Sequence, residues 1–190
     1  MILLQRSDWI QAGVEALAQG GVDAIRVEVL AKRLGVSKGS FYWHFRDRAD
    51  LLEAVVDEWE RVTTSIIQAV EVTGGSPVER LQELFHTVTE SSLSFHRAVK
   101  ALHAWAARDP VIAARVAKVE QLRIAYMTRL FERCGFGPAG AKWRAEVAYL
   151  IYLGWMDQAG RATEESMPPS PFDERLTTML LRAPSLPSQE

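Results

Sequence analysis

The chain has 190 residues, of which 48% are apolar and 24% charged, so it is long enough to bury a core and too apolar to be disordered as a whole. Its 22 Lys and Arg against 24 Asp and Glu give a formal net charge of −2, which excludes a polycation and requires any nucleic-acid-binding surface to be local. The single cysteine, Cys134, excludes a disulfide framework and a cysteine-based zinc site.

The N-terminal part of the sequence predicts three short helices. Apolar residues recur at helical spacing along nearly the whole chain and no strand-like alternation is sustained, which favours an all-α fold of about nine helices. The first helix is expected after Ser7, a good N-cap residue. Two shorter helices are expected at about 27–34 and 38–44, separated by Gly35, with Ser37 as the cap of the second.

The rest of the chain predicts longer helices. One begins at Arg48 and carries an apolar stripe to about residue 72, a length of about 36 Å. The segment Ser76-Pro77-Val78-Glu79 is typical of a capped helix start, and Asp109-Pro110 repeats the cap-then-proline signal. The last two helices are expected at 139–161, where apolar residues cover every face, and at 172–181, followed by a frayed tail at 183–190.

Neither end of the sequence suggests membrane targeting. The N-terminal segment MILLQRSDW lacks the basic region and long apolar run of a signal peptide. The longest uncharged apolar stretch, Val147 to Met156, is about half as long as a bilayer span requires. We therefore expect a cytoplasmic protein with no membrane partner.

The two short helices and the turn between them have the form of a helix-turn-helix. The positions that carry a recognisable pattern are Leu30-Ala31, Gly35-Val36-Ser37, Gly39, Phe41-Tyr42, His44-Phe45, Arg48 and Leu51-Leu52. With these residues the sequence resembles the DNA-binding signature of the tetracycline-repressor (TetR) family, which implies a transcriptional regulator, most often a repressor. The resemblance implies a three-helix DNA-binding domain at 1–48 and a helical effector-binding and dimerisation domain at 49–190.

The charge of this segment agrees with DNA binding. Residues 24–48 hold six Lys or Arg and two acids, a local +4 in a chain of net charge −2. The alternative is an ordinary solvated helix face. The resemblance implies phosphate contacts for Ser37, Lys38, Tyr42, His44 and Arg48, and base contacts for Gly39, Ser40 and Trp43.

Three positions of this motif need separate interpretation. Arg26 stands where family members commonly place a Thr or Ser that caps the second helix. Since arginine cannot cap, either Asp23 caps this helix or its start has no cap. Arg26 is itself a candidate phosphate contact. The alternative for Tyr42 and Trp43 is that they are core aromatics. Because they lie about 100° and 200° around the helix from Phe41, they cannot both share its buried side. Phe41 and Phe45 are expected in the core.

The all-round apolar helix predicts a homodimer, since helix-turn-helix proteins read palindromic operators as two-fold dimers. The resemblance implies a four-helix interface made by the last two helices of each subunit. The alternative is a central helix buried within a monomer. The candidate interface residues are Ala148, Leu150, Leu153 and Gly154.

The resemblance also implies a small-molecule effector pocket beside the long helix. An apolar or aromatic, weakly charged effector is expected, because the candidate walls offer rings and histidines but few unpaired charges. Each candidate is equally an ordinary core residue. The candidates are Ile66, Phe85, Phe95, His103, Trp105, Tyr126 and Tyr149.

Two other classes of function compete with a regulator. An enzyme is disfavoured because the sequence has no nucleophile elbow, phosphate-binding Gly-rich loop or metal-binding helix signature. A metal site at His86, His96 and His103 lacks a suitable carboxylate partner, and no cofactor is expected. A helical scaffold that never touches DNA explains the helix count but not the basic second helix.

Overall fold

The computed structural model describes residues 4–172 and 174–182, and every regular element in these ranges is helical. This confirms the all-α prediction, and the count of nine α-helices in the described ranges matches the expected number. The expected fraying at 183–190 concerns residues outside these ranges. The helices are α1 (Arg6–Gly20), α2 (Val27–Arg33), α3 (Lys38–Phe41), α4 (Arg48–Thr73), α5 (Pro77–Thr89), α6 (Leu93–Ala106), α7 (Pro110–Arg133), α8 (Pro138–Ala159) and α9 (Glu174–Leu181), with short 3₁₀ turns at Val22–Ala24 and Glu164–Ser166.

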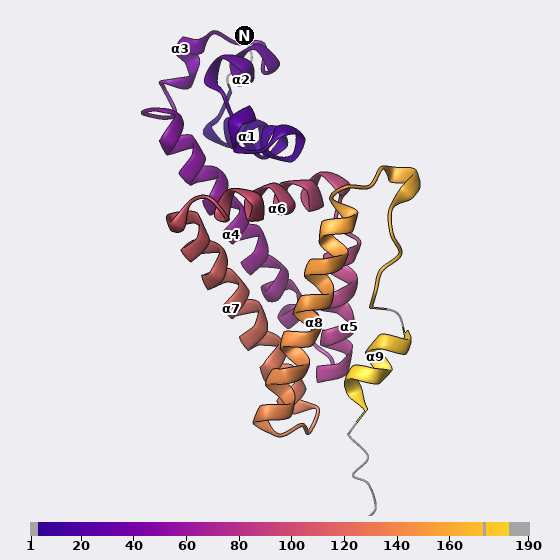
Figure 1. The fold of residues 1–190 in the computed structure, drawn as a ribbon. Coiled ribbons are helices and arrows are strands. Elements are labelled where there is room, and N and C mark those ends of the chain that lie inside the picture. Colours follow the sequence, from indigo (N-terminus) through magenta and orange to yellow (C-terminus); the bar gives the residue numbers. More distant parts are fainter. Residues whose placement is uncertain (1–3, 173, 183–190) are drawn as a thin grey trace, which may run out of the picture.

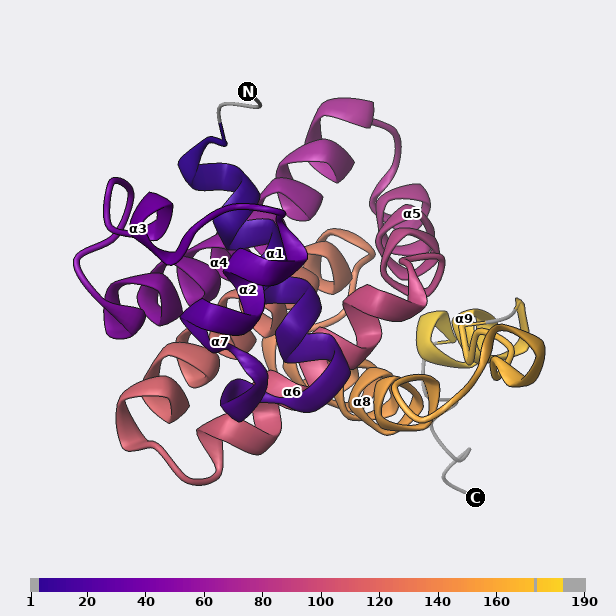
Figure 2. The same ribbon diagram turned by 90° about the horizontal axis from the view of Figure 1, so that it is seen from above.

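The first three helices form a head at one end of the molecule, and α4 leads from this head into a larger helical body (Figure 1). Within the body, α8 packs along α7, and α6 lies between the head and the rest of the body (Figures 1 and 2). The helix α9 lies at the outer edge, beside α5 and α8. Across the described residues, we find no helix with the length and apolar character needed to cross a membrane.

The capping signals place most helix starts correctly. At α5, Glu79 N donates to Ser76 Oγ over 3.3 Å and Ser76 N donates to Glu79 Oε2 over 2.7 Å, which is the predicted capping box. At α7, the Asp109 carboxylate accepts from two backbone N–H groups. The predicted start of α1 is wrong, because the helix begins at Arg6 and the backbone N–H of Gln5 donates to the Asp8 carboxylate over 2.6 Å.

Three aromatic rings pack together in the core of the head. Trp9 and Phe41 are fully buried with their ring centroids 5.2 Å apart, and Phe45 stacks on Phe41 at 5.3 Å. Arg48, the first residue of α4, donates from Nε to the carbonyl of Ile25 and from Nη2 to that of Val22, over 2.5 and 2.6 Å. Its guanidinium therefore ties the start of α4 to the loop between α1 and α2.

The head is attached to the body at two places. One attachment is α4 itself, against which α1 packs closely; a Cβ on Gly13 would lie 2.7 Å from Cγ2 of Val55, so only glycine permits this approach. The other is an extensive contact between α1 and α6. The head is therefore joined to the body through α6 as well as through α4.

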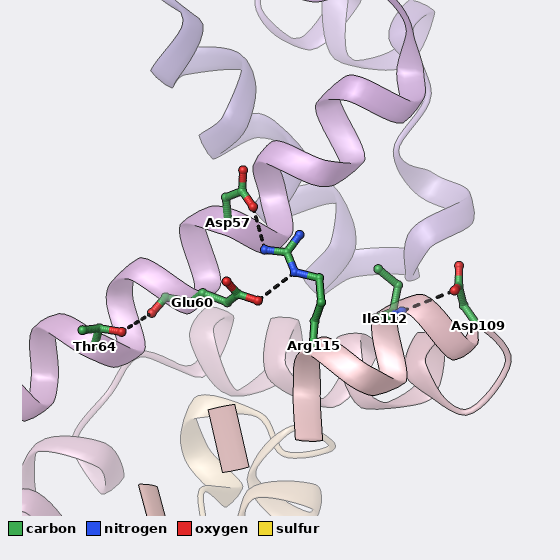
Figure 3. A network of polar contacts seen from close by, with 6 residues as sticks. All are labelled: Asp57, Glu60, Thr64, Asp109, Ile112 and Arg115. Atoms are coloured by element: carbon green, nitrogen blue, oxygen red, sulfur yellow. Dashed lines mark hydrogen bonds and ion pairs between the residues drawn. The ribbon is translucent and has the colours of Figure 1, made fainter. Parts of the chain in front are cut away.

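An arginine on α7 clamps the middle of α4 (Figure 3). Arg115 donates from Nε to Glu60 Oε1 over 2.7 Å and from Nη2 to Asp57 Oδ1 over 2.6 Å. The two carboxylates lie one helical turn apart on α4, so a single planar guanidinium bridges them. This contact fixes α4 relative to α7 near the start of the body.

Candidate nucleic-acid interface and effector cavity

The turn between α2 and α3 has the geometry that the sequence predicted. Gly35 has φ of +69°, a left-handed conformation that favours glycine. The second helix of the motif is shorter than expected, since α3 ends at Phe41 and turns follow to His44. Ser37 occupies the N-cap position, but its side chain makes no capping hydrogen bond, so its exposed hydroxyl remains available to other partners.

The aromatic residues after α3 divide between core and surface. Phe41 and Phe45 are buried, as predicted, whereas Tyr42 is 55% and Trp43 is 88% exposed. The alternative of a core role for Tyr42 and Trp43 is therefore wrong. An indole exposed to this extent loses favourable burial in the free protein, which points to a surface kept for a partner.

The other predicted contact residues lie near these rings. Ser37, Lys38 and Gly39 are exposed, and Ser40 and His44 are half-buried. The Lys38 ammonium forms an ion pair with the Glu28 carboxylate of α2, and this carboxylate raises the pKa of Lys38. The charge of Lys38 is therefore partly neutralised by Glu28 before any phosphate binds.

Several cations of the motif are neutralised within the head. Arg33 donates to Gln19 over 2.9 Å and lies 3.6 Å from the Glu15 carboxylate. Arg46 lies 3.6 Å from the Asp50 carboxylate, although its own side chain is 82% exposed. The local +4 of the sequence is thus partly cancelled in space.

The three remaining cations of residues 24–48 are Arg48, Arg26 and Lys32. Arg48 is half-buried and donates from Nε and Nη2 to the carbonyls described above, which leaves Nη1 for its predicted phosphate contact. Arg26 is exposed at the N-cap of α2 and provides no cap, so the helix start is bare. Arg26 and Lys32 have no acidic partner within 4 Å among residues 4–172 and 174–182, and Lys32 was not among the predicted contacts.

A cavity in the body lies between α4, α5, α7 and α8. Its enclosed space is about 40 Å³, enough for a few water molecules, and its empty volume including the open mouth is about 450 Å³. Three of the seven predicted pocket residues line it: Ile66, Phe85 and Tyr149. The full lining is Thr63, Ile66, Ile67, Leu84, Phe85, Val88, Arg123, Met127, Ala148, Tyr149, Tyr152 and Phe172.

The other four predicted pocket residues lie elsewhere. Phe95 lines a separate groove between α1, α4 and α6. Trp105 is buried, and the Tyr126 hydroxyl donates to Glu71 over 2.8 Å. His103 Nδ1 lies 3.9 Å from Glu120 Oε1, and burial lowers the pKa of its imidazole.

Sequence reasoning missed the polar part of the cavity, which consists of Thr63, Arg123 and Tyr152. A signal for Arg123 was present, because it follows Val119 and precedes Met127 by four residues each, on the buried stripe of α7. A cation on such a stripe is rare unless it has a specific partner.

The histidines considered for a metal site lie in different environments. His96 is fully buried beside Trp155, at 4.9 Å between ring centroids, whereas His86 is exposed. Among the residues placed by the structure, no group of three His, Cys, Asp or Glu side chains is arranged to hold a metal ion.

The predicted interface residues of α8 do not share one face. Leu150 is 66% exposed, Gly154 is exposed and Leu153 is half-buried. Ala148 is 0% exposed and lines the cavity, so its assignment to a partner-facing surface is wrong. Two exposed apolar side chains were missed: Trp143 on α8, at 58%, and Met179 on α9, at 57%.

Comparisons with known proteins find sequence similarity that covers the head. The family model described as "Bacterial regulatory proteins, tetR family" matches residues 10–55. The chain is 40% identical over 57 residues to the tetracycline repressor protein class A from transposon 1721 of Escherichia coli, covering 30% of this chain and 26% of that protein. It is 30% identical over 94 residues to the transcriptional regulator AcuR of Cereibacter sphaeroides, covering 49% and 42%. The chain thus spans less than half the length of these relatives.

The fold resembles solved structures over nearly its whole length. A transcriptional regulator from Rhodococcus sp. Rha1 superposes with a TM-score of 0.76 at 19% sequence identity, covering 94% of both chains. At this identity the similarity concerns the fold. It extends the likeness from the head, where the sequence matches lie, to the helical body.

Proposed function

Because this chain belongs to the TetR family of bacterial regulatory proteins, we propose that it is a homodimeric transcriptional repressor that a small molecule releases from a palindromic operator. Residues 1–48 bind DNA in this proposal, and residues 49–190 bind the effector and dimerise. The family consists of regulatory proteins, and we assign this chain no catalytic residue.

The observation that carries the proposal is the exposed end of the α3 segment. Tyr42 and Trp43 point to solvent while Phe41 anchors the same turn in the core. Ser37, Lys38 and Gly39 lie exposed at the start of α3, where the Ser37 hydroxyl and the Lys38 ammonium can donate to a phosphate oxygen. Donors for phosphate and an apolar ring for a thymine methyl thus occur side by side, as DNA reading requires.

The dimer in this proposal forms through the exposed apolar surface of α8 and α9. Trp143, Leu150 and Gly154 follow one another at steps of seven and four residues, so they lie on one face of α8. Met179 adds an exposed apolar side chain on α9. An exposed apolar stripe of this kind is typical of a subunit interface.

Effector release acts through α4 in this proposal. The cavity lies against α4 at Thr63, Ile66 and Ile67, and the same helix begins at the head with Arg48. The two heads must lie about 34–36 Å apart to enter successive major grooves, so a shift of a few ångströms spoils one half-site. By linkage, operator DNA must weaken effector binding by the same factor as the effector weakens DNA binding.

The test begins with selection of bound duplexes from a random pool, followed by affinity measurements against salt. Arg26→Ala or Lys38→Ala should lower the slope of log K against log salt by about 0.9 each and weaken all sequences alike. Trp43→Ala should instead change the preferred bases, at about 1–3 kcal/mol on the best site. Lys118→Ala, an exposed change on α7, is the matched control and should leave the slope unchanged. A selection that yields no preferred sequence contradicts the proposal.

A further inference from the structure

The wall of the effector cavity contains a cation without an acidic partner. Arg123 donates from Nη2 to Thr63 Oγ1 over 2.9 Å, while its Nη1 is buried and has no hydrogen-bond partner. Within the described ranges, no carboxylate lies within 4 Å of the Arg123 nitrogens. The guanidinium lies 5.8 Å from the Trp59 ring and 5.7 Å from the Tyr152 ring, so aromatic faces supply its remaining electrostatic support.

A second unpaired donor faces the same space. Tyr152 is 5% exposed, lines the cavity, and has a buried hydroxyl with no hydrogen-bond partner. Burial raises the pKa of Tyr152, so the hydroxyl keeps its proton and remains a donor at neutral pH. The Arg123 guanidinium acts on the Tyr152 hydroxyl and partly offsets this rise in pKa, so the two groups form one polar site in the wall. Neither Nη1 of Arg123 nor the Tyr152 hydroxyl has a hydrogen-bond partner of good geometry in this site.

The rest of the cavity is apolar. Phe85 and Phe172 stack with ring centroids 4.1 Å apart, and Ile66, Leu84 and Met127 add to the apolar lining. A cation left unpaired in such surroundings loses hydration without compensation, and a bound anion restores it.

We propose that the effector is an amphipathic carboxylic acid, whose carboxylate binds Arg123 and Tyr152 and whose apolar body lies against the Phe85 side of the cavity. This inference rests on the proposed function in taking the cavity as the effector site. A carboxylate fits better than a phosphate dianion, because one free guanidinium N–H edge and one hydroxyl match two carboxylate oxygens and leave a second charge unmatched. The enclosed space of about 40 Å³ holds little more than the carboxylate, so the apolar body occupies the wider mouth.

The proposal replaces the sequence-based expectation of a weakly charged effector. That expectation rested on wall residues that did not include Arg123. With a buried guanidinium in the wall, a neutral ligand of the same shape leaves the cation unpaired, and an anionic one does not. The acid should therefore bind about tenfold to a hundredfold more tightly than its neutral isostere.

The test uses two matched pairs of probes with the full chain: 4-phenylbutanoate against 4-phenylbutan-1-ol, and octanoate against octan-1-ol. Dissociation constants are measured by calorimetry at pH 7.5 without DNA. The expected result is a preference of at least about tenfold for the acid in each pair. In Arg123→Met the preference should fall to within about twofold of unity, and Tyr152→Phe should retain part of it. Arg129→Met, an exposed arginine on the same helix, is the control and should keep the full preference.

Three results overturn the proposal: an alcohol that binds as tightly as its acid, an acid preference that survives Arg123→Met, or no acid binding at 5 mM. Thermal denaturation checks that Arg123→Met folds. If it does not, the wild-type acid preference and its reduction in Tyr152→Phe decide the question, because this change removes one hydroxyl and keeps the buried ring. DNA affinity is measured separately. If an acid binds and the affinity for DNA does not fall, the proposed release from the operator is wrong, but the carboxylate site stands. If neutral compounds release the protein from DNA and acids do not, the carboxylate proposal is wrong, but the proposed regulator function stands.

Discussion

Replacement of Arg115 by methionine removes the ionic contact between α7 and α4 while keeping most of the apolar stem of the side chain. The Arg115 side chain is 24% exposed, and its two acceptors differ: Glu60 is 29% exposed and Asp57 is 68% exposed. Both acceptors draw the guanidinium toward the charged form, and together they raise its pKa. The exposures, however, predict that the two hydrogen bonds contribute unequally to stability.

The partly buried bond to Glu60 should be worth about 1–2 kcal/mol, because a charge-assisted hydrogen bond shielded from water retains most of its strength. The bond to Asp57 should contribute at most about 0.5 kcal/mol, the value typical of an exposed ion pair. Arg115→Met should therefore lower the free energy of unfolding by about 1–3 kcal/mol, part of it because Glu60 is left without its partner.

Double-mutant cycles with Glu60→Gln and Asp57→Asn separate the two bonds. Urea denaturation followed by circular dichroism, at one fixed protein concentration because a dimer is expected, gives each coupling energy. Raising the salt concentration should erase the coupling to Asp57 before that to Glu60. A coupling energy between Arg115 and Glu60 below about 0.3 kcal/mol, or one smaller than that between Arg115 and Asp57, would falsify the claim that the partly buried bond to Glu60 provides most of the stabilisation.

Three further results are expected. Leu150→Glu should convert the dimer to a monomer in sedimentation at micromolar concentration, whereas the same change at Leu122, an exposed leucine of α7, should not; a dimer in both would place the interface elsewhere. Burial lowers the pKa of His96, so its uncharged form is favoured in the folded state, and the free energy of unfolding should fall as the pH drops below about 6.5. In His96→Phe this decline should be shallower, and an unchanged pH profile would rule out His96 as its source. Glu28→Gln should raise affinity for duplex DNA at low salt by releasing Lys38, and equal affinity would show that the pair does not compete with phosphate.

The helix boundaries that the sequence predicted are those with a local chemical signal. Ser76-Pro77 and Asp109-Pro110 start helices because their caps and prolines act within four residues, so no tertiary information is needed. The start of α1 was misplaced because Ser7 is a better cap by residue type, yet Asp8 binds the backbone N–H of Gln5 and starts the helix earlier. Two acceptable local signals competed there, and packing of Trp9 into the head fixes the register.

The candidate sites divide in the same way. The residues from Ser37 to Phe45 lie within one short stretch, so their spacing predicted that Tyr42 and Trp43 could not both share the buried side of Phe41. That both rings are exposed follows from the end of α3 at Phe41, which the sequence did not predict. The cavity is assembled from four helices far apart in sequence, and no local pattern distinguishes Phe85, which lines it, from Trp105, which does not. On α8 the apolar residues surround the helix, so sequence could not tell the buried Ala148 from the exposed Leu150 two positions later.

The contact between α1 and α6 determines how the head can move. Beyond α1, α6 is joined to the end of α8: Lys100 forms an ion pair with Asp157 at 3.0 Å, and Arg97 donates to the carbonyl of Ala162 over 2.8 Å. The head is therefore held from two sides, by α4 and by the α1–α6 contact, and the second attachment leads through α6 to α8. In the proposed repressor, any movement of α4 that displaces the head must also shift the α1–α6 contact.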